Sequence, residues 1–242
     1  MSSDAAALMR QEPARGRPGW LLQALSVLRK DIAIELSTGE VVVTSGFFGL
    51  LIVVLSSLAF YGGPGSQRLV GAGVIWVSLS FSAVLALGKT WQRERDEGAL
   101  EGLLLLPLAR SAIFAGKALG VLGFLLAICL LVIPIAALLF SLDLVQVGPG
   151  LLCIALATVP GLSASGTLFG AMTVRTQARD LLLAVVLFPL LTPTLLCAVA
   201  ATRELFAGAA LSELGDYFRL LGVFDVVFIA GGLGLFGSLI ER

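Results

Sequence analysis

The stretch Leu69–Leu87, LVGAGVIWVSLSFSAVLAL, contains no charged residue, and the stretch Lys89–Glu101, KTWQRERDEGALE, follows it almost at once. A helix that crosses the hydrocarbon core of a bilayer needs about 20 apolar residues. The first stretch therefore predicts a membrane-spanning helix. The second, which we call the charged island, must lie outside the lipid, where a soluble partner can reach it.

The composition of the whole chain supports this interpretation. Hydrophobic residues make up 58%, charged residues 13%, and the mean hydropathy is +1.01. A soluble domain is typically about half apolar and about a quarter charged, so this chain has too little polar surface to cover a water-soluble body. The apolar runs are continuous rather than alternating, which predicts helices and not a β-barrel. A net charge of zero offers no argument for a nucleic-acid partner.

Apolar runs of spanning length occur six times, which predicts an all-α polytopic membrane protein with six transmembrane helices. The predicted spans are Val41–Phe60, Leu69–Leu87, Ala112–Phe140, Val147–Val174, Leu181–Thr202 and Leu220–Ile240. Pro134 is expected to kink the third span. Pro189 and Pro193 are expected to bend or break the fifth.

The distribution of basic residues predicts the orientation. An even number of spans puts both termini on one side. Placing the termini in the cytoplasm leaves only Arg68, Arg203 and Arg219 of the 16 basic residues on the other side. The positive-inside rule therefore favours cytoplasmic N and C termini.

Three regions follow from these patterns. Residues 1–17 are expected to be a disordered extension, and residues 18–40 an amphipathic helix on the cytoplasmic membrane surface. Leu21, Leu25, Leu28 and Ile32 recur there at helical spacing. Residues 41–242 form the six-helix domain, with a cytoplasmic coupling segment at 88–111. The outer loop Ala201–Arg219 is expected to hold a short interfacial helix around a break at Gly208.

The charged island has a pattern of its own. Arg93, Glu97 and Glu101 share one helical face, and an apolar face formed by leucines lies beside it. An ordinary solvated loop needs no such pairing. The pattern favours a short cytoplasmic helix that docks in a groove of a partner, with a bend at Gly98 and an end at Pro107.

Two blocks of sequence resemble a known family. Gly73–Val77 with Arg93–Pro107, RERDEGALEGLLLLP, is similar to permease subunits of ABC exporters of the second type. Together with Thr173–Leu183, TVRTQARDLLL, and the paired prolines of Leu187–Pro193, it resembles more narrowly CcmB, the haem exporter protein B of cytochrome c maturation. The resemblance covers about residues 20–240. The extension 1–17 and the turn Gly88-Lys89 depart from the family pattern and leave the local coupling geometry open.

The resemblance implies which residues contact an ATPase subunit. The implied coupling residues are Arg93, Glu94, Asp96, Glu97, Gly98, Leu100, Glu101, Leu104 and Pro107, and a second cytoplasmic turn holds Arg175 and Arg179.

The resemblance also implies a function. The chain would be the permease subunit of an ABC transporter-like complex in the bacterial inner membrane. It would couple ATP hydrolysis by the partner ATPase CcmA to haem export, or to release of the haem-loaded periplasmic chaperone CcmE. CcmC and CcmD are the other implied partners, and two copies of this chain per complex are expected because ABC permeases need two membrane halves.

Haem is expected to be handled by the complex rather than bound as a cofactor of this chain. The chain has no histidine, and its methionines are Met1, Met9 and Met172. Axial ligands to haem iron must therefore come from partners, and no metal site is expected. Gly88-Lys89-Thr90 imitates the end of a phosphate loop, but position 83 is alanine where that pattern requires glycine. ATP is therefore expected to be handled by another chain.

A few other residues carry weaker signals. Asp225 lies inside the last span, either as an outward group that reaches the surface or as a polar patch that faces other subunits. Lys117 is expected to extend its ammonium group to the cytoplasmic surface. The pairs Gly116/Gly120 and Gly166/Gly170 permit close helix contact, within the chain or at a homodimer seam.

Three other functions are compatible with parts of the sequence. An ABC exporter of another substrate, such as a lipid or a drug, is the main alternative. A passive assembly scaffold would tolerate charge reversal at Glu97 and Glu101. A membrane-embedded enzyme needs clustered polar groups at membrane depth, and only Asp225 and scattered hydroxyls are present there. We therefore expect a non-catalytic subunit.

Overall fold

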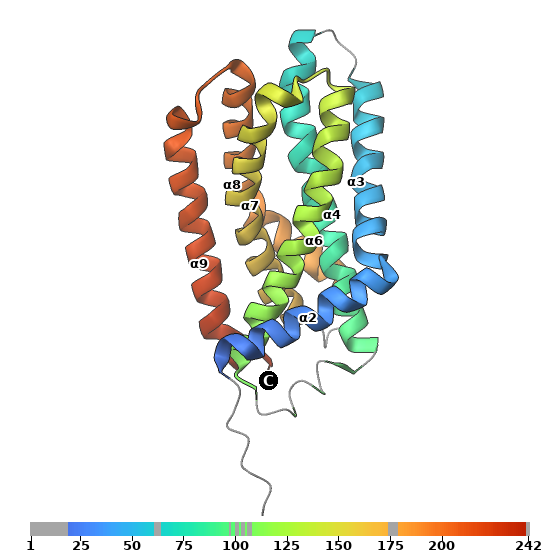
Figure 1. The fold of residues 1–242 in the computed structure, drawn as a ribbon, viewed down its shortest axis with the longest axis vertical. Helices are drawn as coiled ribbons and strands as arrows, with labels where there is room; N and C mark the ends of the chain where they lie inside the picture. Colours follow the sequence, from blue (N-terminus) through green and yellow to red (C-terminus); the bar gives the residue numbers. More distant parts are fainter. Residues whose placement is uncertain are drawn as a thin grey trace, which may run out of the picture.

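The computed structural model describes residues 19–60, 64–96, 98, 99, 102, 105, 108–173 and 179–240. These residues form helices and turns, and no strand occurs among them (Figure 1). The long elements, in chain order, are α2 (Trp20–Thr38), α3 (Glu40–Ala59), α4 (Pro64–Asp96), α6 (Arg110–Leu139), α7 (Leu144–Thr173), α8 (Arg179–Ala207), the short 3₁₀ helix η1 (Leu211–Leu214) and α9 (Gly215–Ile240). The predicted extension 1–17 lies outside the described residues.

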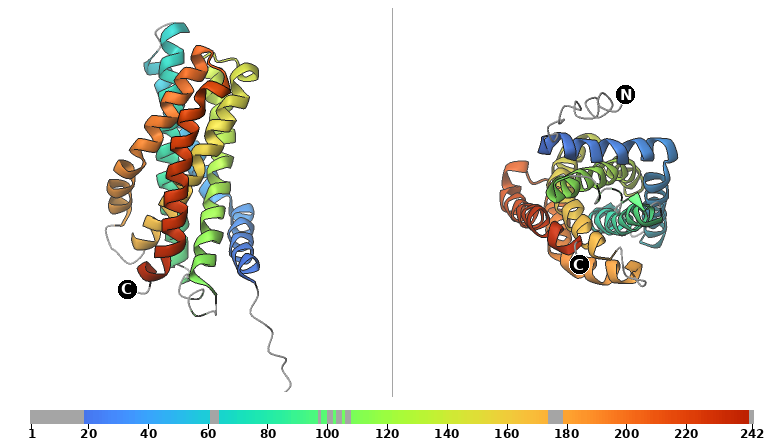
Figure 2. Two further views of the ribbon diagram at one scale, coloured as in Figure 1. Left: turned by 90° about the vertical axis from the view of Figure 1, so that its left-hand side faces the viewer. Right: turned by 90° about the horizontal axis from the view of Figure 1, so that it is seen from below.

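Six of these helices are long and apolar enough to cross a membrane, namely α3, α4, α6, α7, α8 and α9. They stand side by side as one bundle, and α2 runs obliquely across the lower end of that bundle (Figures 1 and 2). The predicted all-α fold class with six spans is therefore confirmed. We call the end that carries α2 the α2 end, and the opposite end the η1 end.

Gly39 makes the corner between the crossing helix and the first span. Its φ of +63° lies in the left-handed region that glycine adopts without strain, and its N–H donates to the carbonyl of Glu35 over 2.6 Å. The chain ends α2 there and enters α3 upright.

The charged island differs from the prediction at its start. The second span does not end near Leu87, because α4 continues to Asp96 and includes the first half of the island. Gln92, Arg93, Glu94 and Arg95 are good helix formers, and the two arginines in the last turn suit the negative end of the helix dipole. The helix stops before Gly98, whose φ of +61° supports the bend predicted there.

The proline-rich fifth span stays one helix. α8 continues through Pro189 and Pro193, and Figure 2 shows it curving away from the bundle toward the α2 end. At the η1 end α8 runs on to Ala207. Gly208, with a φ of +98°, breaks it, and η1 follows. The outer loop therefore contains the predicted break, but its helical parts are the end of α8, a single 3₁₀ turn and the start of α9.

α6 lies inside the bundle and packs on α2, α3, α4, α7 and α9. Its inner face carries Ile128, Val132 and Ala136, which are fully buried. Two hydrogen bonds between helices pair polar groups inside the bundle, which apolar surroundings favour. The Trp76 indole N–H donates to the hydroxyl of Thr202 over 2.8 Å, and the Ser82 hydroxyl donates to the carbonyl of Ser45 over 2.9 Å.

Candidate functional site

The α2 end joins the crossing helix to two spans through a notch in α6. Gly116 and Gly120 form this notch, and α2 lies in it. A Cβ atom on Gly116 would stand 2.5 Å from the carbonyl oxygen of Ala24 and 2.7 Å from Cβ of Val27. The two glycines thus allow a backbone approach that a side chain at position 116 would prevent. Gly116/Gly120 therefore packs within the chain and is not a homodimer seam.

A buried ion-pair group lies directly beside this notch. Lys117 of α6 is only 1% exposed, and its ammonium group contacts Asp31 of α2 at 3.0 Å and Glu94 of α4 at shorter range. The Asp31 and Glu94 side chains are also buried, with 6% and 4% exposed. The expectation that Lys117 reaches the surface is wrong, because two carboxylates satisfy its charge inside the protein.

Lys30 is the fourth charged residue of this ion-pair group, and it approaches the two carboxylates from the side nearer to solvent. Its ammonium group lies 2.6 Å from Glu94 Oε1 and 3.0 Å from Asp31 Oδ1. Burial by itself lowers the pKa of Lys30, but the adjacent Asp31 and Glu94 carboxylates outweigh it and raise the pKa. We call Lys30, Asp31, Glu94 and Lys117 the charge cluster. Its two positive and two negative charges balance, which is the condition for holding ions out of water.

A second set of contacts fixes the corner between α2 and α3. The carboxylate of Glu35 accepts hydrogen bonds from the backbone N–H groups of Val41 and Val42, at 3.2 and 2.8 Å. It thereby caps the first turn of α3. Glu40 pairs with Lys89 at 2.8 Å and with Arg93 at 3.3 Å. The end of α4 is thus attached to the α2–α3 corner as well as to the charge cluster.

The structure divides the predicted coupling residues into two groups. Glu94 is buried and pairs inside the protein, and the partly exposed Arg93 pairs with Glu40 at the surface. Asp96 is exposed at the end of α4, and Gly98 turns the chain. Arg179 begins α8, and nothing is described of its side chain. The other predicted coupling residues lie outside the described residues, namely Glu97, Leu100, Glu101, Leu104, Pro107 and Arg175.

Three members of the charge cluster were not among the predicted site residues. Lys30 and Asp31 belong to a helix assigned to the membrane surface, and Lys117 was treated as a single charge near a span end. A signal did exist: an ammonium group at that depth needs a carboxylate partner. The sequence offers several carboxylates on the same side and does not say which of them lies close by.

The carboxylate of Asp225 points inward, so the expectation of an outward group that reaches the surface is wrong, while a polar patch that faces other subunits stays a prediction. Its carboxylate points at Gly161 of α7, where a Cβ atom would stand 2.6 Å from Oδ1. Oδ1 itself is buried. The side chain therefore fills space between α9 and α7 and does not extend outward to the surface. The second glycine pair behaves similarly, since Leu87 and Trp91 of α4 occupy the room beside Gly166 and Gly170.

The chemistry available at the α2 end is electrostatic. Among the described residues, no three His, Cys, Asp or Glu side chains are grouped so that they could hold a metal ion. What the arrangement provides is a rigid connection, in low dielectric, between one transverse helix and two spans.

Six apolar helices with a charged connection at one end define a multi-pass membrane protein. A family model described as "CcmB protein" matches residues 22–235. The chain is 30% identical to the "Heme exporter protein B" of Bradyrhizobium diazoefficiens, over 87% of this chain and 94% of that protein. It is also 30% identical to the protein of that name from Haemophilus influenzae, over 84% and 90%, and 32% identical to the one from Paracoccus denitrificans, over 76% and 84%. The chain belongs to the CcmB family.

Proposed function

We propose that the chain is the permease subunit of a haem-export complex for c-type cytochrome maturation in a bacterial inner membrane, driven by a separate ATPase. The names of its relatives support the substrate, and the six spans support the permease role. The proposal assigns ATP hydrolysis to CcmA and places CcmC, CcmD and the chaperone CcmE in the same complex. This chain has no histidine to ligate haem iron, so it moves or releases haem without holding it as a cofactor.

The observation that carries the coupling mechanism is the position of Glu94. It lies within one helical turn of the exposed Asp96 and pairs inside the protein with Lys117 of α6 and Lys30 of α2. The segment from Asp96 to Pro107 connects α4 to α6 at this same end. An ATPase that rests on the segment therefore acts on α4 at the residue that α4 uses to hold α2 and α6.

The low dielectric around the cluster makes this connection stiff. Pulling α4 away would separate Glu94 from both Lys30 and Lys117 and leave a buried carboxylate unpaired, which is costly. A force on the coupling segment is therefore expected to move α4, α6 and α2 together instead of pulling them apart. Through α6, which packs on most of the other helices, the displacement reaches the body of the bundle.

The proposal is tested by reversing charge in the segment. Glu97→Lys with Glu101→Lys in the full chain, co-expressed with CcmA, CcmC, CcmD and CcmE, should abolish co-purification of the ATPase and the formation of c-type cytochromes. The chain should still insert in the membrane. The matched control is Glu204→Lys with Glu213→Lys, two exposed carboxylates at the η1 end. Retained ATPase and normal cytochrome levels in the first variant would show that the segment does not couple.

The alternative, an exporter of a lipid or a drug, makes a different prediction for the purified complex. Its ATP hydrolysis would rise on adding that substrate and would not respond to CcmE. The haem proposal requires that ATP hydrolysis respond to CcmE and not to an added lipid or drug.

A further inference from the structure

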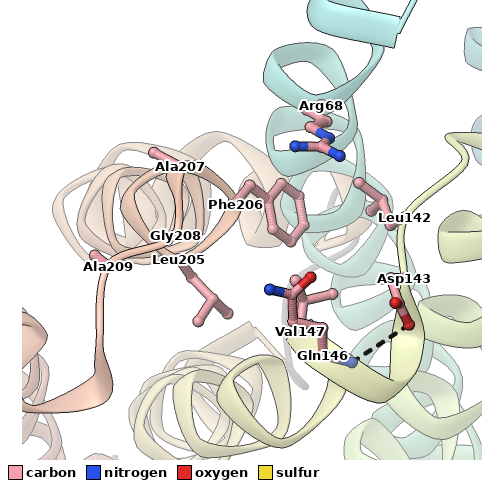
Figure 3. Close-up of a pocket in the computed structure, with 10 residues that line it drawn as sticks. All are labelled: Arg68, Leu142, Asp143, Gln146, Val147, Leu205, Phe206, Ala207, Gly208 and Ala209. Atoms are coloured by element: carbon pink, nitrogen blue, oxygen red, sulfur yellow. Dashed lines mark hydrogen bonds between the residues drawn. The ribbon is translucent and has the colours of Figure 1, made fainter.

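A hollow opens at the η1 end, opposite the charge cluster (Figure 3). Its volume is about 330 Å³, and it lies between the start of α4, the α6–α7 turn and the end of α8. We call it the outer hollow. Its lining residues are Arg68, Leu142, Asp143, Gln146, Val147, Leu205, Phe206, Ala207, Gly208 and Ala209.

The walls of the outer hollow are held by hydrogen bonds and burial. Asp143 Oδ1 accepts from the backbone N–H groups of Val145 and Gln146 at 3.0 and 3.4 Å, and so caps α7. Two backbone hydrogen bonds cap the end of α8. The N–H of Gly208 donates to the carbonyl of Leu205 over 3.1 Å, and the N–H of Ala209 donates to the carbonyl of Glu204. Phe206 is buried and forms a side wall. The cavity is therefore formed before any ligand arrives.

The charges in the outer hollow are not equivalent. Asp143 is engaged by two N–H donors at the positive end of the α7 dipole, which offsets its charge. Arg68 makes no ion pair or hydrogen bond with any residue that the structure describes. Arg219, at the same end, has a partner in Asp216 at 2.8 Å. Figure 3 shows the Arg68 guanidinium on one side of the hollow and the Gln146 amide on the other, with the Phe206 ring between them.

We propose that the outer hollow receives an acidic side chain of a partner protein, with Arg68 binding the carboxylate and Phe206 packing on the adjacent apolar residue. This inference rests on the proposed function, which puts haem-handling partners in the same complex, and on the positive-inside rule, by which the η1 end faces the periplasm. Arginine and aromatic side chains in a preformed pocket are typical of the anchors that dominate protein interfaces.

Two other occupants fit the hollow less well. Its volume is at the lower end of the range of about 300–1,000 Å³ for small-molecule sites, which suits a side chain or two better than a tetrapyrrole. Its walls are helix ends and a turn, whereas a lipid chain would lie along the flanks of the spans. A protein side chain that enters from the aqueous phase meets both conditions.

The test uses the complete complex purified through this chain. A benzoylphenylalanine photo-crosslinker at Gln146 should join the chain to a partner protein at a segment that contains Asp or Glu. Arg68→Glu should lower the crosslink yield about tenfold or more, and Arg219→Glu, the control at a paired arginine, should leave it unchanged. Replacing the acidic residue of the partner by arginine should restore crosslinking in the Arg68→Glu chain.

Several outcomes would overturn the inference. They are a crosslink to phospholipid only, a crosslink to a second copy of this chain only, and an unchanged yield in Arg68→Glu. Should Arg68→Glu fail to insert, the crosslink yield is measured in Arg68→Gln instead. This variant removes the positive charge without reversing it, and it should also lower the yield. ATPase co-purification is read in the same samples, because it depends on the other end of the bundle. If it persists while crosslinking shows no acidic partner, the outer hollow is refuted and the proposed coupling function stands.

Discussion

Lys117 shows what one buried charge demands of its surroundings. Its ammonium group pairs with Asp31 and Glu94, and both carboxylates are buried, so water cannot replace the ammonium group as their partner. Removing one partner of such a group typically costs about 3–5 kcal/mol, whereas replacing the whole group by apolar side chains is often neutral. The contribution of Lys117 therefore depends on which partners remain.

We predict that Lys117→Met lowers the free energy of unfolding in detergent by about 3 kcal/mol or more, because two buried carboxylates are left with Lys30 alone. Adding Glu94→Leu and Asp31→Leu to the same chain should recover most of the loss. Denaturant unfolding of the three-residue variant beside the single variant measures this. A single variant as stable as the parent chain would contradict the role given to Lys117 in holding the two carboxylates.

Gly116 allows a direct comparison with another glycine of the same helix. A methyl group on Gly116 would meet the Ala24 backbone, whereas nothing lies within 4 Å of the corresponding position on Gly123. Gly116→Ala should therefore destabilise the chain by about 1–3 kcal/mol, the usual cost of overpacking. Gly123→Ala should be neutral or stabilising by up to about 1 kcal/mol through helix propensity. Thermal unfolding of the two variants side by side tests the packing of α2 on α6.

At the scale of the element, α2 is amphipathic in an unusual sense. Its acidic and amide side chains face the protein, where Gln23 accepts from the Ala109 N–H at 2.7 Å and Asp31 meets Lys117. Its leucines face outward, with Leu21 68% and Leu25 52% exposed. An apolar outward face on a helix at the end of a membrane bundle is suited to the interfacial region of the bilayer.

This placement predicts how the three tryptophans respond to lipid. Trp20, at the start of α2, is exposed, while Trp76 and Trp91 are buried. Brominated phospholipids should therefore quench the fluorescence of a chain that retains only Trp20 much more than that of a chain that retains only Trp76. Leu21→Glu with Leu25→Glu should reduce the quenching of Trp20. Equal quenching of the two single-tryptophan chains would place α2 away from the lipid.

The elements also show how far the sequence predicts this fold. Each span is a continuous apolar run, so its existence needs no knowledge of the rest of the chain, and all six are present. The limits of α4 were wrong because charges that look solvated in sequence find partners on α2, α3 and α6. Those partners are distant along the chain: Lys30 and Glu94 are 64 residues apart, and Asp31 and Lys117 are 86 apart. Periodicity reports the faces of one helix and contains no record of which other helix meets them.

At the scale of the whole molecule, the two ends of the bundle are electrically different. The α2 end holds Lys30, Lys89, Arg93, Arg95 and Lys117, while the η1 end has Arg68, Arg203 and Arg219. By the positive-inside rule the α2 end should face the cytoplasm. The coupling segment and the charge cluster then lie where ATP is available, and the outer hollow faces the opposite compartment.

This orientation can be measured with two introduced thiols. Ser37, near the end of α2, and Ser212, in η1, are both exposed. The native Cys129 and Cys197 are buried, and Cys153 lies in the middle part of α7, within a span that lipid would cover. We expect Ser212→Cys to react with a membrane-impermeant maleimide in intact spheroplasts, and Ser37→Cys to react only after the membrane is opened, with the unmutated chain as the background. The reverse pattern would put the charge cluster and its coupling segment outside, beyond the reach of any cytoplasmic ATPase, and the proposed mechanism would fail with it. Each thiol is introduced into a chain of its own, so that labelling reports on one end: inverted insertion would label Ser37→Cys in intact spheroplasts, whereas a loss of insertion would label neither variant until the membrane is opened.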